Sequence, residues 1–329
     1  MKLIRRHLPT VLGLLISASA LFWLAQQFNL AELTDALQQV DLFVLVPVPV
    51  LILMSFIMRA QRWRLLVDHQ PQIRFWPSFS ALMIGYLLNN ILPARAGDVA
   101  RALELGRSEK MSRTKAFATL VTERTVDLVT TLTLLAAVLL GYPALPEWIK
   151  KAGMLIALLS IAAMSLLVLA HTTGRRWIPR LVAMLSQWLP GAVRTKLDQM
   201  VMSTLEGIAG MFRSSHAVGF LLLTGFIWAL EVVMVHLVAS SVGLPLALGN
   251  ALLVLLVLAM GSMVPSSPGQ LGTYEFVGLA ALALVAIQGP MALAFIVMLH
   301  LLTLMGSTVI GVVCLLARER SPLLLKDTP

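Results

Sequence analysis

The chain has 329 residues, of which 58% are hydrophobic and only 12% are charged. Soluble domains usually contain roughly twice that charged fraction, so the composition excludes a single water-soluble domain and predicts a protein that uses lipid as solvent for much of its surface. The formal net charge is +9, but the basic residues lie between apolar segments, which favours membrane lipids, especially anionic ones, as partners and argues against nucleic acid.

Eight apolar segments predict an all-α polytopic membrane protein, formed by a single integral membrane domain over 1–329. In chain order the segments are 8–28, 42–60, 75–93, 117–140, 152–171, 217–242, 246–288 and 290–317. The first follows a basic N-terminus and resembles a secretory signal, but apolar residues continue beyond the cleavage-like Ala18-Ser19-Ala20, so an uncleaved span is favoured. The polar stretch 172–216 is predicted to be a cytoplasmic, amphipathic interfacial segment.

The distribution of Lys and Arg predicts the topology. Because cytoplasmic loops are enriched in basic residues, both termini are expected in the cytoplasm, with 22 basic residues inside, two outside and Arg124 within a span. Segment 75–93 begins and ends on the basic side, and 246–288 begins and ends near uncharged turns. Both are therefore predicted to be re-entrant hairpins, which leaves six spans.

The two hairpins share a local pattern. Segments 90–97 and 262–269 each have a small polar residue, two apolar residues, a proline and a glycine four positions later, at an offset of 172 residues. Each half, 1–141 and 152–317, also has the order span, span, hairpin, span, but the halves start on opposite sides. The proline–glycine motif alone is weak, and the charge pattern supplies an independent observation. Together they predict an inverted repeat, whose paired interrupted segments indicate a transport site.

In the first hairpin, Arg95 lies at the break itself, and an arginine near a helix start is typical of an anion site. For Arg101, anion binding and an ordinary inside-positive role both remain open. Asp98 is expected to cap the next helix. The hairpin residues predicted to bind a headgroup or phosphate are Asn89, Asn90, Arg95 and Arg101, and those predicted to have a structural or coupling role are Pro93, Gly97 and Asp98.

The second hairpin is an irregular polar stretch within an apolar region. Such backbone is tolerated at membrane depth only where it is buried in protein or faces a watery cavity. For Glu275, two roles remain open: bonding the amides at its helix start and coupling transport. The remaining candidates are Ser266 and Ser267 for headgroup binding, and Pro265, Pro268, Gly269 and Gly272 for a structural or coupling role.

Three ionisable residues occur within five positions of the fourth segment. Glu123, Arg124 and Asp127 are costly there and are typical of residues that line a cavity. Arg124 and Asp127 are one helical turn apart, which leaves two interpretations open. Either they form a self-neutralising structural pair, or Arg124 binds a substrate phosphate while Glu123 and Asp127 position it.

Three other ionisable residues in apolar segments, Glu231, His236 and His300, either take part in proton coupling or pack as satisfied polar groups. The sequence has no Walker loop, nucleophile elbow, His-Glu-x-x-His motif or Asp-rich metal cluster. We therefore expect no cofactor, no metal, no catalytic residue and no enzyme activity.

Blocks 89–101, 123–127 and 265–275 resemble the signature blocks of the lysylphosphatidylglycerol synthase transmembrane, or flippase-like, family. The resemblance extends over nearly the whole chain and implies a bacterial or archaeal membrane protein. In the larger two-part synthases, the membrane portion is associated with flipping aminoacylated phosphatidylglycerol, which a separate soluble portion makes. This chain has no room for that portion, so the resemblance implies lipid movement and not aminoacyl transfer. One departure is Gln270, because family members often have two glycines where this chain has Gly269-Gln270.

The leading hypothesis is a flippase or scramblase-like transporter of an anionic phospholipid or polyprenyl-phosphate lipid in the bacterial cytoplasmic membrane. Two alternatives remain: a transporter of a small anionic solute, and a non-transporting membrane partner of a lipid-modifying enzyme. A homo-oligomer is also left open.

Overall fold

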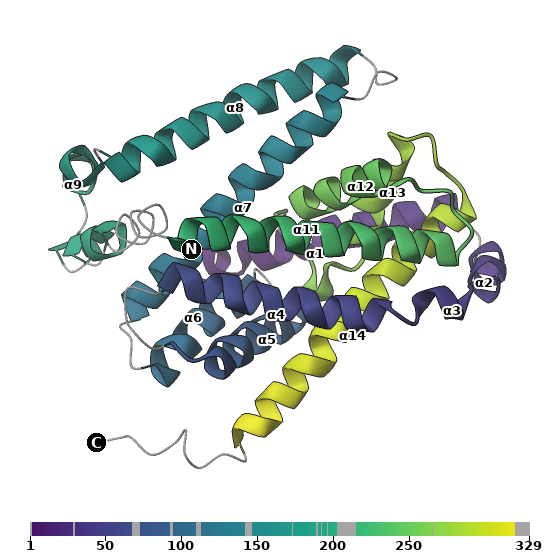
Figure 1. Cartoon of the computed structure of the whole chain (residues 1–329), viewed down its shortest axis with the longest axis horizontal. Helices are drawn as coiled ribbons and strands as arrows, with labels where there is room; N and C mark the ends of the chain where they lie inside the picture. The colour runs from purple at the N-terminus through teal and green to yellow at the C-terminus, as the bar shows by residue number, and fades with distance from the viewer. Residues whose placement is uncertain are drawn as a thin grey trace. The chain divides into compact units, whose positions relative to one another are not determined.

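The computed structural model describes residues 2–28, 30–67, 73–92, 95–109, 113–141, 147–172, 174–188, 190–191, 193–195, 197–202, 215–264 and 266–319. Every regular element in these ranges is a helix (Figure 1), which confirms the predicted all-α class. Two predicted structural residues, Pro93 and Pro265, and much of the predicted interfacial segment 172–216 lie outside the described residues.

The helices follow the predicted apolar segments closely. Their bounds are α1 Lys2–Gln27, α2 Leu30–Gln38, α3 Leu42–Leu45, α4 Val48–Val67, α5 Phe75–Ile91, α6 Ala96–Ser108, α7 Arg113–Gly141, α8 Glu147–Thr172, α9 Gly174–Leu185, α11 Ser215–Ser241, α12 Leu248–Gly261, the 3-10 turn η2 Pro268–Gln270, α13 Thr273–Ala283 and α14 Pro290–Glu319.

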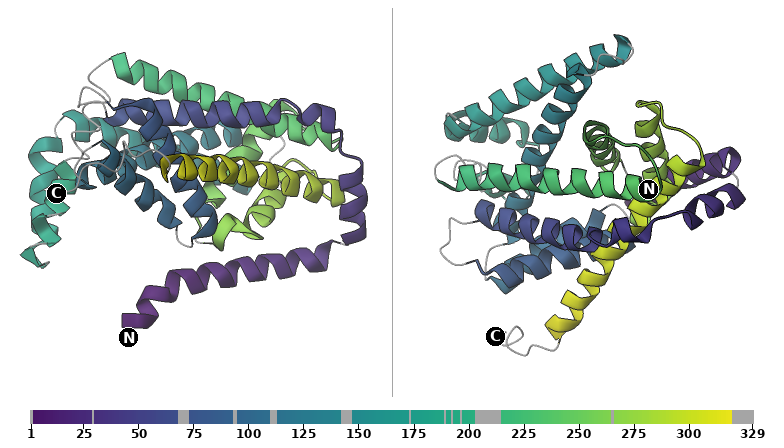
Figure 2. Two further views of the ribbon diagram at one scale, coloured as in Figure 1. Left: turned by 90° about the horizontal axis from the view of Figure 1, so that it is seen from below. Right: turned by 45° about the vertical axis from the view of Figure 1, so that its right-hand side comes forward.

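Several of these helices are long and apolar enough to cross a bilayer. Within the described residues there are four: Leu42–Leu66, Ala116–Gly141, Val218–Ser241 and Pro290–Arg318. A fifth results if the bent pair Gly13–Gln27 and Ala31–Gln38 forms one span. The last of the four belongs to α14, which is one continuous helix in both views of Figure 2. The chain is therefore a multi-pass membrane protein, while the count of six spans stays a prediction.

Both predicted hairpins are interrupted helices. In the second, α12 has 14 residues and α13 has 11, so neither reaches the ~30 Å of a hydrocarbon core at ~1.5 Å per residue. In the first, α5 has 17 residues and α6 has 13. The predicted element 75–93 is thus only the first arm, and α6 follows the break.

Glycines allow the arms of each hairpin to approach closely. A Cβ on Gly97, at the start of α6, would lie 2.0 Å from the Gly85 carbonyl oxygen of α5. A Cβ on Gly261, at the end of α12, would lie 2.5 Å from a methyl carbon of Val277 in α13. Only a residue without a side chain fits at either position.

The chain forms two compact units by contact density. The first contains residues from 1–56, 83–97 and 227–320, and the second contains residues from 57–82 and 98–226. Each unit contains segments of both predicted halves, 1–141 and 152–317. The boundaries of the units therefore differ from those of the halves, and the inverted repeat stays a prediction.

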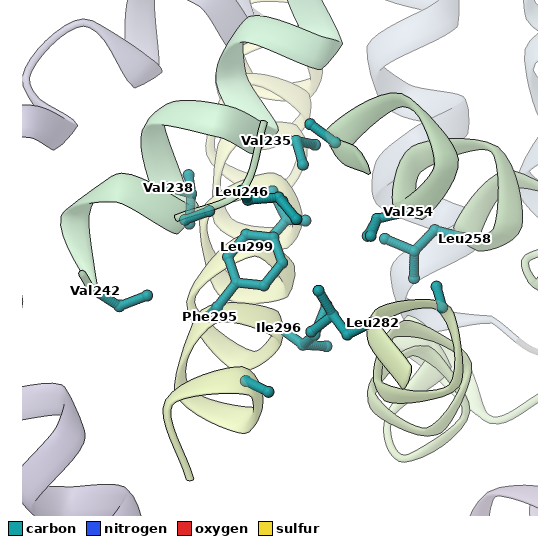
Figure 3. Packing of buried hydrophobic residues seen from close by; sticks show 14 of the residues in the cluster. Val235, Val238, Val242, Leu246, Val254, Leu258, Leu282, Phe295, Ile296 and Leu299 are labelled. Carbon is teal, nitrogen blue, oxygen red and sulfur yellow. The ribbon is translucent and has the colours of Figure 1, made fainter. Parts of the chain in front are cut away.

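In the first unit, α11, α12, α13 and α14 surround an apolar core (Figure 3). Val238, Val254, Leu282 and Phe295 are each fully buried in it. Lipid tails are as apolar as these side chains, so close packing, rather than the hydrophobic effect, stabilises such a core. The second unit pairs α7 with α8, where a Cβ on Gly153 would lie 3.0 Å from the Leu139 Cβ.

Candidate functional site

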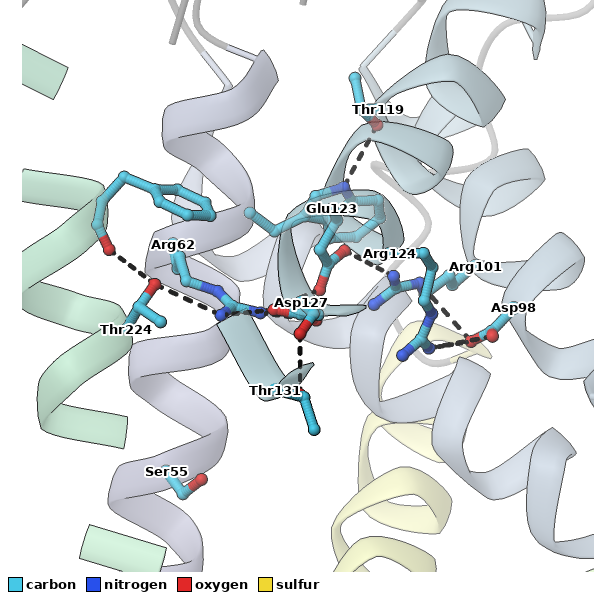
Figure 4. Close-up of polar contacts among 12 residues, drawn as sticks. Ser55, Arg62, Asp98, Arg101, Thr119, Glu123, Arg124, Asp127, Thr131 and Thr224 are labelled. Atoms are coloured by element: carbon cyan, nitrogen blue, oxygen red, sulfur yellow. Dashed lines mark hydrogen bonds and ion pairs between the residues drawn. The ribbon is translucent and has the colours of Figure 1, made fainter. Parts of the chain in front are cut away.

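A network of six charged side chains, three of them buried, lies within the second unit (Figure 4). Its side chains come from α4, α6 and α7, and we call it the charge network. Its members are Arg62, Asp98, Arg101, Glu123, Arg124 and Asp127. Three arginines face three carboxylates, so the formal charges of the six side chains balance.

Arg62 of α4 is the link between α4, α7 and α11. Its guanidinium lies 2.8 Å from one Asp127 oxygen and 3.5 Å from Glu123, and it donates to the Thr224 hydroxyl at 3.4 Å. The Phe220 ring lies 5.3 Å from its central carbon. With 2% of the side chain exposed, Arg62 is a buried cation that depends on these partners.

Arg101 of α6 is completely buried. It donates to Glu123 at 2.6 Å, and its Nε lies 3.9 Å from Asp98. Its guanidinium carbon lies 4.8 Å from the Trp63 ring, and the indole N–H of Trp63 donates in turn to Thr119 at 3.2 Å. The position of Arg101 in the interior shows that it is not an ordinary loop arginine, which was one of its two predicted interpretations.

Arg124 of α7 is the most exposed arginine of the charge network, with 38% of its side chain accessible. It donates to both carboxylate oxygens of Asp98, at 2.8 and 2.9 Å. Asp98 lies in the first turn of α6, after Ala96, so the predicted cap position is corrected: the helix begins before Asp98. Both oxygens of its carboxylate accept from the same terminal nitrogen of Arg124, so the pair is a charge-assisted contact.

The predicted pair of Arg124 and Asp127 is wrong, whereas phosphate binding by Arg124 stays a prediction. Asp127 pairs with Arg62, and Arg124 pairs with Asp98. The closest cation to Glu123 is Arg101, at 2.6 Å. Since isolated charges at such burial are expensive, the balanced pairing explains how a span tolerates three of them.

The two helix breaks meet within the first unit. The Asn90 amide donates to the hydroxyls of Ser307 and Thr308 on α14, at 2.9 and 3.0 Å. A Cβ on Gly269, in the second break, would lie 3.6 Å from the Asn90 carbonyl oxygen. Arg95 donates to the Ser262 carbonyl at the end of α12. We call this contact region of Asn90, Arg95, Ser262 and Gly269 the hairpin junction.

Backbone conformation at the hairpin junction is unusual on both sides. Arg95 has φ +54° in the first break, and Gly269, Gln270 and Gly272 have φ +65°, +59° and +82° in the second. Residues other than glycine rarely adopt this left-handed region of backbone conformation. Gly269 and Gly272 adopt this region without a steric penalty, and Gln270 adopts it at a steric cost.

Helix α1 packs against the second break. The Ser267 backbone N–H donates to the Ser17 hydroxyl at 2.9 Å, and the Ser267 hydroxyl donates to the Leu271 carbonyl at 3.3 Å. A Cβ on Gly13 would lie 2.8 Å from the Ser266 carbonyl oxygen. Pro268 begins the 3-10 turn. These contacts hold the loop in place through its backbone.

Glu275 and His300 connect the second break to α14. The Glu275 carboxylate accepts the Gly272 backbone N–H at 2.7 Å, which confirms the predicted bond at the start of α13. Its other oxygen lies 2.6 Å from His300 Nδ1, and His300 Nε2 lies 2.8 Å from the Gly269 carbonyl oxygen. Elsewhere in this unit, Glu231 accepts from Ser55 at 2.8 Å, and His236 Nδ1 lies 2.7 Å from the Leu246 carbonyl oxygen.

Two residues of these sites were missed or undervalued by sequence reasoning. Arg62 was counted among the basic residues on the cytoplasmic side, because it lies near the end of a span. A signal was present in α7, where two carboxylates, Glu123 and Asp127, have only one neighbouring cation, Arg124, so a second cation was to be expected from another helix. His300 had no sequence signal beyond its position in an apolar segment. In the described part of the chain, no group of three His, Cys, Asp or Glu side chains is placed to hold a metal ion.

Residues 10–311 match the family described as the lysylphosphatidylglycerol synthase TM region. The chain belongs to that family. The matched residues include all members of the charge network and of the hairpin junction. No solved structure matches the chain.

Two relatives extend this family assignment. A UPF0104 membrane protein of Methanothermobacter thermautotrophicus is 26% identical over 60% of this chain and 62% of that protein. A protein of Haloferax volcanii named glycosyltransferase AglD is 24% identical over 88% of this chain and 52% of that protein. The chain thus spans less than two thirds of the length of these relatives.

Proposed function

We propose that this chain is a lipid transporter, flippase or scramblase-like, that moves an anionic phospholipid or polyprenyl-phosphate lipid across the bacterial cytoplasmic membrane. The observation that supports it most directly is the hairpin junction, where two interrupted helices bring polar groups together among apolar helices. A headgroup needs such groups to pass through hydrocarbon, because an unsatisfied polar group costs several kcal/mol there.

The topology is part of the proposal. The order α4, α5, break, α6, α7 parallels α11, α12, break, α13, α14, which supports two inverted halves with two re-entrant hairpins and both termini in the cytoplasm. Interrupted helices at corresponding positions are the usual location of a substrate site in transporters with inverted repeats.

We assign phosphate binding in the second unit to Arg124. Arg62 and Arg101 are buried beyond reach at 2% and 0% exposure, whereas 38% of the Arg124 side chain is accessible. A lipid phosphate would replace Asp98 as the charged acceptor of Arg124, and guanidinium groups can bind a phosphate through two parallel N–H bonds. Arg62 and Arg101 would position Glu123 and Asp127 without touching lipid.

The family name and the relatives' names support lipid as the substrate class. The family is named for a lysylphosphatidylglycerol synthase, and one relative is named a glycosyltransferase. We propose that this chain contributes movement of lipid rather than a chemical step, and that an enzyme of lipid modification is its partner or supplies its substrate.

Reconstitution in liposomes tests the proposal. Purified protein in vesicles with fluorescent anionic phospholipids or polyprenyl phosphates should accelerate movement between leaflets relative to empty vesicles. Arg124→Gln should abolish most of that acceleration. Lys150→Gln is the matched control, since Lys150 is also partly exposed and pairs with a carboxylate, Glu147, at 3.4 Å.

Three results would count against the proposal. If no lipid moves faster than in empty vesicles, transport of these lipids is wrong. If sealed vesicles take up a small anion without lipid movement, the chain is a solute transporter. If a lipid-modifying enzyme co-purifies and keeps full activity with both Arg95→Ala and Arg124→Ala, the chain is a non-transporting subunit.

A further inference from the structure

His300 is held between two hydrogen-bond acceptors. Its Nδ1 lies 2.6 Å from a Glu275 carboxylate oxygen, and its Nε2 lies 2.8 Å from the Gly269 carbonyl oxygen. The other Glu275 oxygen is occupied by the Gly272 N–H at 2.7 Å. His300 and Glu275 are only 6% and 8% exposed, so water has little access to compensate a poor contact.

The two hydrogen bonds of His300 require two ring or carboxyl protons. Neutral His300 and ionised Glu275 together carry only one. A carbonyl oxygen only accepts, so Nε2 must donate to Gly269. A neutral ring then has no proton on Nδ1, and its lone pair would face the carboxylate at 2.6 Å. An additional proton, on Nδ1 or on the carboxyl, removes that repulsion in either location.

We propose that His300 and Glu275 form a proton-binding site, and that its proton controls the second helix break and couples lipid movement to proton movement. This inference rests on the proposed function for its coupling role, but the proton site itself does not depend on lipid. Here the ligand is H⁺, and the moving part is the loop at Gly269.

Loss of the proton releases Gly269. The neutral ring retains one N–H for two acceptors, and the ionised carboxylate takes it because a hydrogen bond to a charged acceptor is stronger than one to a carbonyl. The Gly269 carbonyl then loses its donor. Because a Gly269 Cβ would lie 3.6 Å from the Asn90 carbonyl oxygen, this release loosens the hairpin junction on the side of the second break.

Other ionisable groups lie on the elements that pack against His300 and Glu275. Helix α1, which packs on α13, has its ionisable residues within its first six positions, as Lys2, Arg5, Arg6 and His7. On α13, Tyr274 stacks on the His300 ring with 4.2 Å between centroids, and Glu231 of α11 interacts electrostatically with Tyr274. Helix α2, which packs on α14, has Glu32 and Asp35 at exposed positions. Helix α12 has no ionisable residue, and Arg95 donates to its Ser262 carbonyl.

The substitution Glu275→Gln allows the same hydrogen bonds to form but removes the need for the added proton. The glutamine amide N–H can donate to Nδ1 of neutral His300, its oxygen can accept the Gly272 N–H, and Nε2–H still binds Gly269. All three contacts are thus made without an added proton. The matched controls are Glu231→Gln, a carboxylate bound to Ser55, and His236→Gln, a histidine bound to the Leu246 carbonyl.

Hydrogen–deuterium exchange of the protein in nanodiscs measures the loop directly. After correction for intrinsic exchange, protection of 266–273 in the wild type should fall as pH rises, approaching about tenfold per pH unit for one released proton. Glu275→Gln should show protection that is independent of pH, and both controls should behave as the wild type. A wild-type profile without pH dependence, or the same dependence in Glu275→Gln, would overturn the proton site.

A second measurement guards against a variant that does not fold. ¹⁵N spectra of protein that retains only His300 among its six histidines should show Nε2 protonated at low pH, and a shift to Nδ1 protonation as pH rises. A ring protonated only at Nδ1 throughout would contradict the proposal.

Lipid movement in liposomes of the same lipid composition as the nanodiscs then tests the coupling to protons. An imposed pH gradient should change the rate several-fold in the wild type and in both controls, but not in Glu275→Gln. If lipid moves at a rate that ignores the gradient, coupling is wrong and the proposed function stands. If the loop responds to pH but no lipid moves, the proposed function fails and the proton site stands.

Discussion

Replacement of Arg62 by methionine should destabilise the second unit strongly. The substitution leaves Glu123 with Arg101 at 2.6 Å, but it removes the cation that lies 2.8 Å from Asp127. Asp127 is 20% exposed, so water compensates it only partly. Removal of one partner from a buried pair costs about 3–5 kcal/mol, and because Glu123 keeps a partner we expect the lower end, about 3 kcal/mol.

That loss corresponds to roughly two powers of ten in the unfolding equilibrium. It can be measured by titrating the protein in mixed micelles with SDS and following tryptophan fluorescence. The double variant Arg62→Met/Asp127→Asn should recover about 1 kcal/mol or more, because the unpaired charge is removed as well.

Arg64→Met on the same helix is the matched control. Arg64 is partly buried and donates to the Ile73 carbonyl and to Gln61, at 2.9 and 2.8 Å. We expect a loss of only about 1 kcal/mol there, since both acceptors that lose their donor are neutral and no carboxylate is left without its cation. Equal losses for Arg62→Met and Arg64→Met, or no gain in the double variant, would refute the view that Arg62 stabilises Asp127 as an ion pair.

Three further substitutions test the hairpin junction, each by the same SDS titration. Gly97→Ala should cost about 1–3 kcal/mol, the usual penalty of overpacking, because its Cβ would lie 2.0 Å from a carbonyl oxygen. The control Gly249→Ala should be tolerated, since a Cβ there would have nothing within 4 Å. Asn90→Ala should cost about 1–3 kcal/mol by leaving the buried Ser307 hydroxyl without its amide donor; an unchanged midpoint would contradict this bond. Gln270→Val should cost about 1–3 kcal/mol at its φ of +59°, and Gln270→Gly should cost none; equal stability of these two variants would refute the strain.

The helical class and the places where helices break were predictable from sequence. Composition and hydropathy depend on residue types alone, and the positions of the breaks follow from local signals such as Gly97 and Gly269, which tolerate backbone that other residues resist. The second arm of the first hairpin was not predicted, because α6 contains Arg101, Glu104 and Arg107 and its apolar periodicity is weak.

Pairings across the chain were beyond sequence reasoning because they depend on which helix faces meet. Arg62 and Asp127 are 65 residues apart, and no local pattern in either span indicates the other. An arginine near the end of a span commonly marks the cytoplasmic side, and Arg62 was counted among the 22 basic residues there. Its burial became visible only when α4, α7 and α11 were placed together.

In the proposed mechanism a lipid phosphate replaces Asp98 on Arg124, and the surroundings of Asp98 offer its carboxylate another cation. Asp98 is shared: Arg124 binds it at 2.8 Å, and Arg101 Nε lies 3.9 Å away. Arg101 Nε and one of its terminal nitrogens have no hydrogen-bond partner. When a lipid phosphate takes Arg124, a small movement of Asp98 toward Arg101 forms a new charge-assisted bond in its place. The cost of displacing Asp98 is thereby reduced, and completely buried Arg101 serves the exchange without contacting lipid.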